Sequence, residues 1–311
     1  MADIYDSILD LIGGTPLLAL DRLHPGPGRI LAKAEFVQPG GSVKDRAALR
    51  IIQDARTAGR LAPGQTVVEM TSGNMGAGLA VVCNVYGHPF VATMSEGNSP
   101  ARAKMLTALG TEVVLVPQVD GTPGRVTGKD IGSAIGRAEE LVRDRSAYYV
   151  DQFNNPSCVA AHEDGTGPEI AEAVGEKLSA FVACVGTGGT FIGTSRFLKR
   201  WRPGIHCCAV EPQGAEVIAC MEVTKPDHLL QGTGYSIVPP QWQPELADGF
   251  LAVSDDEAIE FQKKLAELEG LFVGYSAAAN VCAATKLLES EQLGPAPVVA
   301  TILCDTGLKY V

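Results

Sequence analysis

Apolar runs and helical spacings alternate along most of this chain. Runs of β-branched and apolar residues predict strands at 66–70, 90–94, 112–116, 148–150, 181–185, 206–210, 271–273 and 298–303. Apolar residues at helical spacing predict helices at 75–86, 100–109, 131–143, 191–199 and 254–270. A capping box opens the last of these helices and a glycine stops it. The alternation is typical of parallel sheets covered by helices on both faces, so it predicts an α/β protein.

One predicted helix start carries a lysine in an unusual setting. Ser42 and Asp45 have the spacing of a capping box, and the apolar residues that follow them predict a helix. Lys44 then lies in the first turn, where the partial positive charge of the helix end disfavours an ammonium. The neutral amine is the form that attacks a carbonyl to make an imine. A surface lysine that happens to begin a helix is the alternative interpretation.

Two glycine-rich turns follow predicted strands. The first, 71–76, reads Thr-Ser-Gly-Asn-Met-Gly, and its backbone N–H groups and short hydroxyls at a helix N-terminus suit a carboxylate. The second, 186–190, reads Gly-Thr-Gly-Gly-Thr, where close backbone approach and two hydroxyls suit a phosphate. Its glycine spacing fits neither a dinucleotide fingerprint nor a Walker loop. A plain tight turn is the alternative for each loop taken singly.

Further motifs extend this pattern over nearly the whole chain. They lie at 12–17, 39–46, 152–156, 162, 166–170, 211–212, 232–234 and 274–276. In this order, and with the two glycine loops, they resemble the cysteine synthase and cystathionine β-synthase family of pyridoxal-phosphate enzymes. The resemblance implies the two-domain, parallel-sheet α/β fold of the tryptophan synthase β-like enzymes, fold type II. It places a smaller, substrate-binding domain at 41–147, a larger domain at 1–40 and 148–311, and the cofactor in the cleft between them.

The resemblance also implies roles for single residues. Lys44 would hold pyridoxal 5'-phosphate as a Schiff base and, once freed by an amino-acid substrate, would remove the α-proton. The cofactor would further contact Asn74, Gly186, Thr187, Gly188, Gly189, Thr190 and Ser276. The substrate would contact Thr71, Ser72, Gly73, Asn74, Met75, Gln152 and Gly232. A hydroxyl at Ser276 facing the pyridine nitrogen favours prompt β-elimination over racemisation, and Ser276 could also cap a helix.

The activity implied is β-replacement on O-acetyl-L-serine or L-cysteine through an aminoacrylate intermediate. Cysteine synthesis with sulfide is the first interpretation. β-Cyanoalanine synthesis from cysteine and cyanide is a close alternative, because Met75 stands where most cysteine synthases have threonine, although Met75 could equally be a packing change. Condensation with a larger nucleophile, β-elimination of cysteine and a non-catalytic regulatory homologue are further alternatives. Ala101 and Ala103 replace charged residues that are usual in the family. Any role of those charges in contacts or in domain closure is therefore not expected to carry over to this chain.

Composition narrows the partners. The net charge is −11 without a basic run, which argues against nucleic acid and anionic membranes. No apolar run approaches ~20 residues, and the first residues resemble no targeting segment, so a cytoplasmic location is expected. The eight cysteines, in mostly apolar contexts, predict free core thiols. The histidines lack metal-ligand spacing, and His162 is expected to be structural. We expect a homodimer that binds a small amino acid and sulfide or cyanide.

Overall fold

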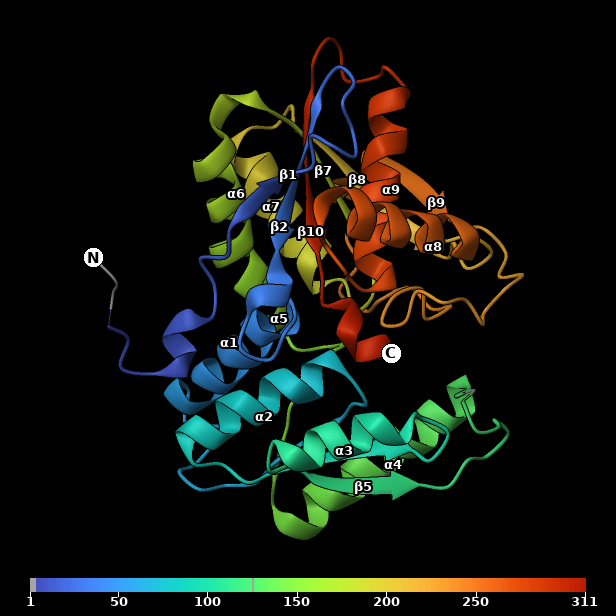
Figure 1. Cartoon of the computed structure of the whole chain (residues 1–311). Coiled ribbons are helices and arrows are strands. Elements are labelled where there is room, and N and C mark those ends of the chain that lie inside the picture. The colour runs from blue at the N-terminus through green and yellow to red at the C-terminus, as the bar shows by residue number, and fades with distance from the viewer. Residues whose placement is uncertain (1–3, 125) are drawn as a thin grey trace. The chain divides into compact units, whose positions relative to one another are not determined.

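The computed structural model describes residues 4–124 and 126–311. The chain divides into two compact units, each with its own sheet (Figure 1). One unit joins the described part of Met1–Ile12 to Gln38–Ser157, and the other joins Gly13–Val37 to Cys158–Val311. The division expected from the resemblance, with a domain at 41–147, stays a prediction.

The first unit contains, among its described residues, a four-stranded parallel sheet in the order β5-β4-β3-β6. Its strands are β3 (Val67–Met70), β4 (Phe90–Ser95), β5 (Glu112–Val116) and β6 (Tyr148–Tyr149). Its helices are α1 (Lys44–Thr57), α2 (Asn74–Tyr86), α3 (Pro100–Ala108) and α4 (Gly128–Arg145), with the 3₁₀ turn η1 (Ile8–Leu11). Helix α4 covers one face, where Ala138 and Leu141 pack on Val68 and Val91. This packing buries the apolar strands that the sequence pattern predicted.

The second unit contains, within the described ranges, a six-stranded sheet in the order β1-β2-β10-β7-β8-β9. Its strands are β1 (Leu17–Ala19), β2 (Arg29–Ala34), β7 (Leu178–Cys184), β8 (His206–Pro212), β9 (Gly249–Val253) and β10 (Val298–Leu303). Only β1 pairs antiparallel to its neighbour; the other pairings of this sheet are parallel. This arrangement of described strands confirms the predicted parallel-rich α/β architecture.

Helices cover both faces of the six-stranded sheet (Figure 1). They are α6 (Gly167–Val174), α7 (Gly189–Trp201), α8 (Asp255–Lys264) and α9 (Tyr275–Glu289), and α5 (Ser157–Ala161) joins the two units in sequence. The remaining short elements are the 3₁₀ helices η2 (Glu35–Val37), η4 (Gly175–Lys177), η5 (Pro244–Leu246) and η7 (Gly307–Tyr310), and the π-helices η3 (His162–Thr166) and η6 (Leu265–Glu269). Strand β7 serves both faces: Ala180 and Val182 join the core cluster of α9, whereas Phe181 stacks on Phe191 of α7. The period-2 alternation of a buried strand explains this division.

Two features of the predicted element pattern need correction. The segment 271–273 is no strand, because it forms only an isolated bridge between Val273 and Thr306. Strands β1, β2 and β9 were not predicted, since β1 has three residues, β2 contains the charged Lys33 and β9 begins with a glycine. The capping box at Ser254 and the left-handed glycine stop at Gly270 are confirmed.

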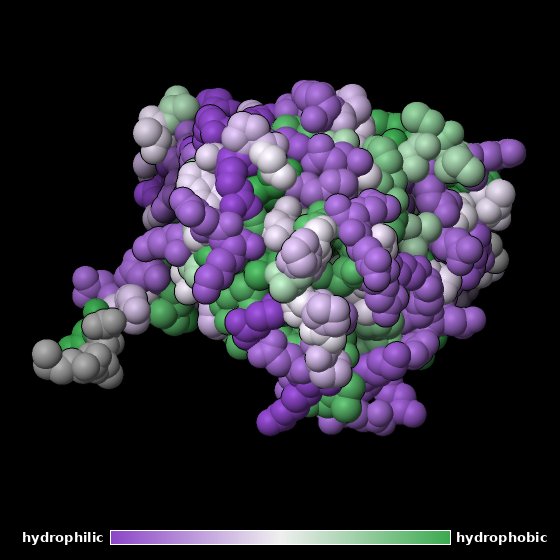
Figure 2. Space-filling model, turned by 90° about the horizontal axis from the view of Figure 1, so that it is seen from above, coloured by the Kyte–Doolittle hydropathy of each residue, from purple (hydrophilic) through white to green (hydrophobic). Residues whose placement is uncertain are grey.

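The surface is largely polar on the face that Figure 2 shows, where hydrophobic residues are scattered among hydrophilic ones. No helix within the described ranges is long and apolar enough to cross a bilayer. The described side chains also contain no group of three or more potential metal ligands. The cysteines are free thiols, of which Cys83, Cys184 and Cys282 are buried, Cys304 is half-buried and Cys220 is exposed. The prediction of free core thiols is therefore confirmed for most of them.

Candidate active site

Lys44 is the first residue of α1, as predicted, and it is half-buried. Its backbone N–H donates to Ser42 Oγ at 3.3 Å. The predicted capping box is wrong, because Val43 is the N-cap residue and it makes no side-chain cap. The Asp45 carboxylate instead accepts the backbone N–H of Gly40 at 2.5 Å, which ties the preceding glycine turn to the helix. A Cβ on Gly40 would lie 2.5 Å from Asp45 Oδ1, so this close approach requires glycine.

The loop between β3 and α2 forms a helix N-terminus rich in donors, as predicted. Thr71 Oγ1 accepts the backbone N–H groups of Gly73 at 3.4 Å and of Gly76 at 3.1 Å, which holds the loop against the first turn. Ser72 and Asn74 are half-buried, whereas Met75 is only 3% exposed. The first N–H groups of a helix have no partner within the helix, so this end can receive an anion.

Ser72 also receives a hydrogen bond that the sequence patterns did not reveal. Arg102, from the first turn of α3, donates from Nη1 to Ser72 Oγ at 3.2 Å. A cation beside the loop adds positive potential where the helix end already favours an anion. The sequence signal was available only in part, because Arg102 sits between Ala101 and Ala103, where the motif departs from the family pattern.

Gln152, predicted to bind the substrate, lies in the turn after β6. Its Nε2 donates to Glu69 Oε1 at 3.1 Å, and both side chains are buried. Glu69 belongs to β3, two residues before Thr71. Burial raises the pKa of Glu69 to about 8, although the hydrogen bond from Gln152 opposes the rise. Sequence reasoning missed Glu69; an acid inside an apolar strand was the available signal.

Replacing Glu69 by glutamine should flatten the dependence of stability on pH. The folded-state pKa lies above the ordinary value of 4.5 and reaches about 8. The contribution of Glu69 to the free energy of unfolding is therefore fully present below pH ~4.5 and is lost as pH rises toward ~8. The loss is on the order of a few kcal/mol. Urea unfolding near pH 5 and near pH 8 should show a smaller difference for Glu69→Gln than for wild type, and equal differences would contradict the expected ionisation.

The glycine cup of the second unit joins the end of β7 to the start of α7. Gly188 is the N-cap residue and has φ of +93°, a conformation that favours glycine. A Cβ on Gly186 would lie 2.1 Å from the carbonyl oxygen of Gly232, and one on Gly189 would lie 2.9 Å from that of Cys158. The chain segments thus approach one another so closely that side chains are excluded. The cup keeps its backbone at the helix end, where an anion binds best.

His162 fixes one hydroxyl of the cup. Its Nε2 lies 3.2 Å from Thr190 Oγ1, and its Nδ1 lies 2.8 Å from Thr166 Oγ1. The ring is 2% exposed. The prediction of a satisfied structural histidine is confirmed. His162 also sets the direction of a threonine that was predicted to bind phosphate.

Two other predicted residues of the second unit lie near the end of β7. Gly234 donates its N–H to the carbonyl of Val185 at 3.2 Å, so the loop that contains Gly232 runs beside the cup. Ser276 is buried, and its carbonyl accepts a hydrogen bond from Cys184 Sγ at 3.6 Å. Carboxyl ends of parallel strands are the usual place for ligands in open α/β sheets.

Ser276 does not cap a helix, so that prediction is wrong. It is the second residue of α9, and Gly274 occupies the N-cap. A Cβ on Gly274 would lie 2.1 Å from Asp305 Oδ1, which shows how closely the helix start approaches that carboxylate. Since the N-cap lies two residues earlier, the Ser276 hydroxyl is not needed for capping.

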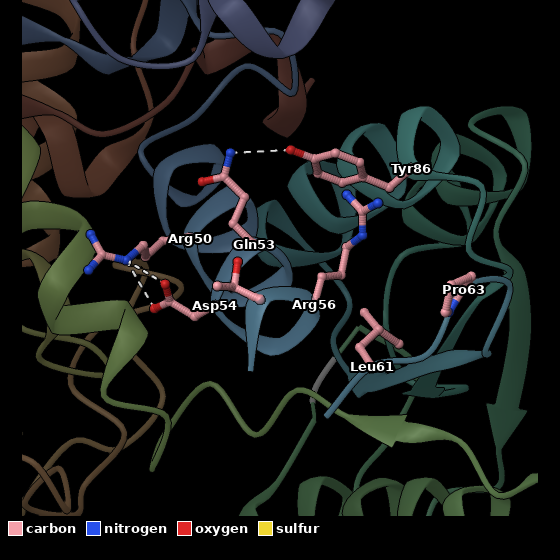
Figure 3. Close-up of a pocket in the computed structure, with 8 residues that line it drawn as sticks. Arg50, Gln53, Asp54, Arg56, Leu61, Pro63 and Tyr86 are labelled. Carbon is pink, nitrogen blue, oxygen red and sulfur yellow. Dashed lines mark hydrogen bonds and ion pairs between the residues drawn. The ribbon is translucent and has the colours of Figure 1, made fainter. Parts of the chain in front are cut away.

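A separate hollow lies on α1 and the residues near it in the first unit (Figure 3). Arg56 stacks over the Tyr86 ring at 4.0 Å, and Gln53 donates to the Tyr86 hydroxyl at 3.2 Å. Arg50 Nε lies 2.9 Å from both oxygens of Asp54. The residues predicted for cofactor and substrate do not line this hollow.

Comparison with known proteins identifies the family. Residues 8–305 match the family described as pyridoxal-phosphate dependent enzyme. Cysteine synthase of Staphylococcus aureus (strain Mu50 / ATCC 700699) is 37% identical over 308 residues, which cover 98% of this chain and 95% of that protein. O-Ureido-L-serine synthase superposes with a TM-score of 0.90 at 35% identity, covering 99% of this chain and 94% of the other. The O-acetylserine-dependent cystathionine β-synthase of Helicobacter pylori gives a TM-score of 0.89 at 33% identity, with coverages of 100% and 98%. The chain therefore belongs to the pyridoxal-phosphate-dependent enzyme family, and pyridoxal phosphate is its cofactor.

Proposed function

We propose that the protein is a cysteine synthase, in which sulfide replaces the acetoxy group of O-acetyl-L-serine. The observation that carries the proposal is the glycine cup at the start of α7, because its glycine-rich backbone suits the phosphate of the cofactor. The similarity to the Staphylococcus aureus cysteine synthase over nearly the whole chain supports this reaction. The named activities of the two structural relatives keep other β-substituted alanine products as alternatives.

The residues of the second unit fit the cofactor. The cup from Gly186 to Thr190 would hold the phosphate through backbone N–H groups and the hydroxyls of Thr187 and Thr190. His162 holds the Thr190 hydroxyl in one direction. Ser276 would face the pyridine nitrogen, and its uncharged hydroxyl does not require a protonated ring.

The residues of the first unit supply the covalent attachment and the substrate contacts. Bound pyridoxal phosphate supplies the electron sink that stabilises negative charge at the substrate α-carbon. Lys44 would bind the cofactor and later take the α-proton with its freed amine. The donors of Thr71, Ser72, Gly73 and Asn74 at the start of α2, together with Gln152 and the neighbouring Met75, would receive the amino acid and its carboxylate. Asn74 would also donate to the cofactor ring oxygen, and Gly232 of the second unit would border the substrate.

A substrate panel tests the proposal. It crosses O-acetylserine, O-phosphoserine, serine and cysteine with sulfide, cyanide and homocysteine on the cofactor-loaded protein. We expect the highest kcat/KM for O-acetylserine with sulfide. A preference for cysteine with cyanide would replace the proposal by β-cyanoalanine synthesis. Pyruvate release without any replacement product would identify a β-lyase, and no reaction with any pair would favour a non-catalytic homologue.

The β-cyanoalanine alternative depends on Met75. This residue replaces a hydroxyl by a thioether in the loop proposed for the carboxylate, and its side chain is buried at the second position of α2. A buried thioether shapes its surroundings by packing rather than by donating a hydrogen bond. Any effect of Met75 on nucleophile choice is therefore expected to act through the shape of the loop.

Replacing Met75 by threonine should raise sulfide addition from O-acetylserine relative to cyanide addition from cysteine. A change of about 1.4 kcal/mol in the difference between the two barriers corresponds to roughly tenfold. The measurement is kcat/KM for both reactions in wild type and variant. Met105→Thr, at a half-buried methionine of α3, is the control and should leave the ratio unchanged. An unchanged ratio in Met75→Thr as well would show that Met75 serves packing alone and would remove the argument for cyanide.

We propose also that the protein works in the cytoplasm as a homodimer, as expected from the sequence. Light scattering on the holoenzyme should then give twice the chain mass of 32.6 kDa. A mass of one chain would refute the dimer.

A further inference from the structure

A buried acid lies directly behind the loop proposed for the substrate carboxylate. Glu69 is the third residue of β3, and its side chain is 1% exposed. Its Oε1 accepts the hydrogen bond from Gln152 Nε2 at 3.1 Å, whereas Oε2 has no hydrogen-bond partner among the described residues. Burial of a carboxyl group costs free energy unless the group is neutral or well bonded. A packing role alone would be served better by an apolar residue.

The surroundings of Glu69 favour its neutral form. Asp151 in the turn after β6 adds negative charge, and Tyr149 on β6 feels the charges of Glu69, Asp151 and Glu139 of α4. On the other side, Glu69 pairs with Ala92 of β4 in the strand register. Burial is the larger cause, and together with Asp151 it raises the pKa of Glu69 to about 8. Near neutral pH the side chain is therefore mostly protonated.

The turn around Gln152 is held by hydrogen bonds of its own and by backbone hydrogen bonds of Asp151 and Gln152 to the Glu69 carboxyl. Asp151 has φ of +51°, in the left-handed region, and its carbonyl accepts the N–H groups of Asn154 at 3.1 Å and Asn155 at 2.9 Å. The Asp151 carboxylate accepts hydrogen bonds from Asn154 Nδ2, and Asn155 Nδ2 donates to the carbonyl of Val150 at 2.8 Å. These bonds hold the turn, so the direction of the Gln152 side-chain amide depends on what that amide contacts.

Glu69 sets that direction. An amide nitrogen carries two hydrogens, so a nitrogen that donates one to Glu69 holds the second in a defined direction. We propose that Glu69 is a positioning residue, which orients the Gln152 amide for binding the carboxylate of the amino-acid substrate. The inference rests on the proposed function, in which Gln152 contacts that carboxylate. A protonated Glu69 adds no charge beside the substrate anion, whereas an ionised one would repel it.

The test separates the carboxylate from the rest of the ligand. Holoenzyme is titrated by calorimetry with L-alanine, which has no β-leaving group, and with ethylamine, which also lacks the carboxylate. Glu69→Leu removes the hydrogen-bond acceptor, and Glu69→Gln keeps an acceptor that cannot ionise. Glu139→Gln, an exposed acid of the same unit, is the control for loss of a negative charge.

Glu69→Leu should weaken L-alanine binding about tenfold and leave ethylamine binding unchanged. Glu69→Gln should bind L-alanine like wild type near pH 7. Above pH ~8, wild type should lose affinity relative to Glu69→Gln, because only wild type can then place a second negative charge near the carboxylate. At a given pH, each ligand has the same protonation state when it is titrated into wild type and into Glu69→Gln. The ratio of the two affinities therefore reports on the protein alone. Glu139→Gln should match wild type throughout.

Several outcomes would overturn the inference. Unchanged L-alanine binding in Glu69→Leu would do so, and an equal loss of both ligands would show a general structural role. If Glu69→Leu does not fold, the pH comparison decides, because parallel losses in wild type and Glu69→Gln contradict a role for the Glu69 proton. If wild type binds neither ligand and performs no β-replacement, both the proposed function and the inference are refuted. If wild type binds L-alanine and both Glu69 variants bind it in the same way as wild type, the inference alone is refuted.

Discussion

Lys44→Ala should abolish covalent attachment of pyridoxal phosphate and lower β-replacement by about 10³-fold or more. The half-buried Lys44 at the start of α1 is proposed both to bind the cofactor and to move the α-proton, so one substitution removes two functions. Borohydride reduction followed by mass spectrometry of the peptides locates the attachment, and visible absorbance reports cofactor content.

Lys104→Ala is the matched control for this experiment. Lys104 is an exposed lysine of α3 in the same unit, and its loss should change neither the labelled peptide nor the rate. If the Lys44→Ala protein still carries a reducible cofactor on another lysine and keeps its rate, the assignment of Lys44 is wrong.

Gly186→Ala should weaken cofactor binding by about tenfold to a hundredfold. A Cβ at this residue would lie 2.1 Å from the carbonyl oxygen of Gly232, so one of the two loops must move. Overpacking of this kind costs roughly 1–3 kcal/mol, and here the displaced backbone is the proposed phosphate site. Equilibrium dialysis of pyridoxal phosphate against apoprotein, with thermal unfolding alongside, measures both binding and fold.

Two further variants make the glycine result specific. Gly204→Ala, at an exposed glycine of the same unit whose added Cβ meets nothing within 4 Å, should bind cofactor normally. Thr190→Val removes a hydroxyl without adding volume and should lower affinity about tenfold. Full cofactor affinity in a folded Gly186→Ala protein would refute the phosphate assignment.

Local patterns predicted much of the fold. Strands at 112–116 and 298–303 have the predicted bounds, and helices α2 and α3 begin and end within about two residues of theirs. Strand β2 escaped prediction because Lys33 interrupts its apolar run. Its Nζ lies 2.7 Å from Glu169 Oε2 and donates to the carbonyl of Thr15 at 2.5 Å, and these partners compensate the buried charge. A partner so distant in sequence cannot be recognised from the local pattern of polar and apolar residues.

The features of the candidate site also divide into those that local sequence predicted and those that depend on contacts between distant residues. The glycine loops at 71–76 and 186–190 were visible because backbone shape depends on glycine within a few residues. The partner of Asp45 was not, since spacing suggested Ser42 while the fold offers the N–H of Gly40. Glu69 was missed because its role depends on Gln152, which lies far along the chain and reaches it only in the folded unit.

Strand β10 follows all the other described strands in sequence, yet it lies in the interior of the six-stranded sheet, between β2 and β7. As the chain leaves the ribosome, β2 pairs only with β1, while β7, β8 and β9 remain a separate group. Both groups keep an open edge until residues 298–303 appear. The first unit has all its residues by Ser157, so it can fold during synthesis, whereas the second must wait. The sheet that carries the glycine cup is thus the part of the nascent chain that we expect to fold more slowly and to be more prone to aggregation.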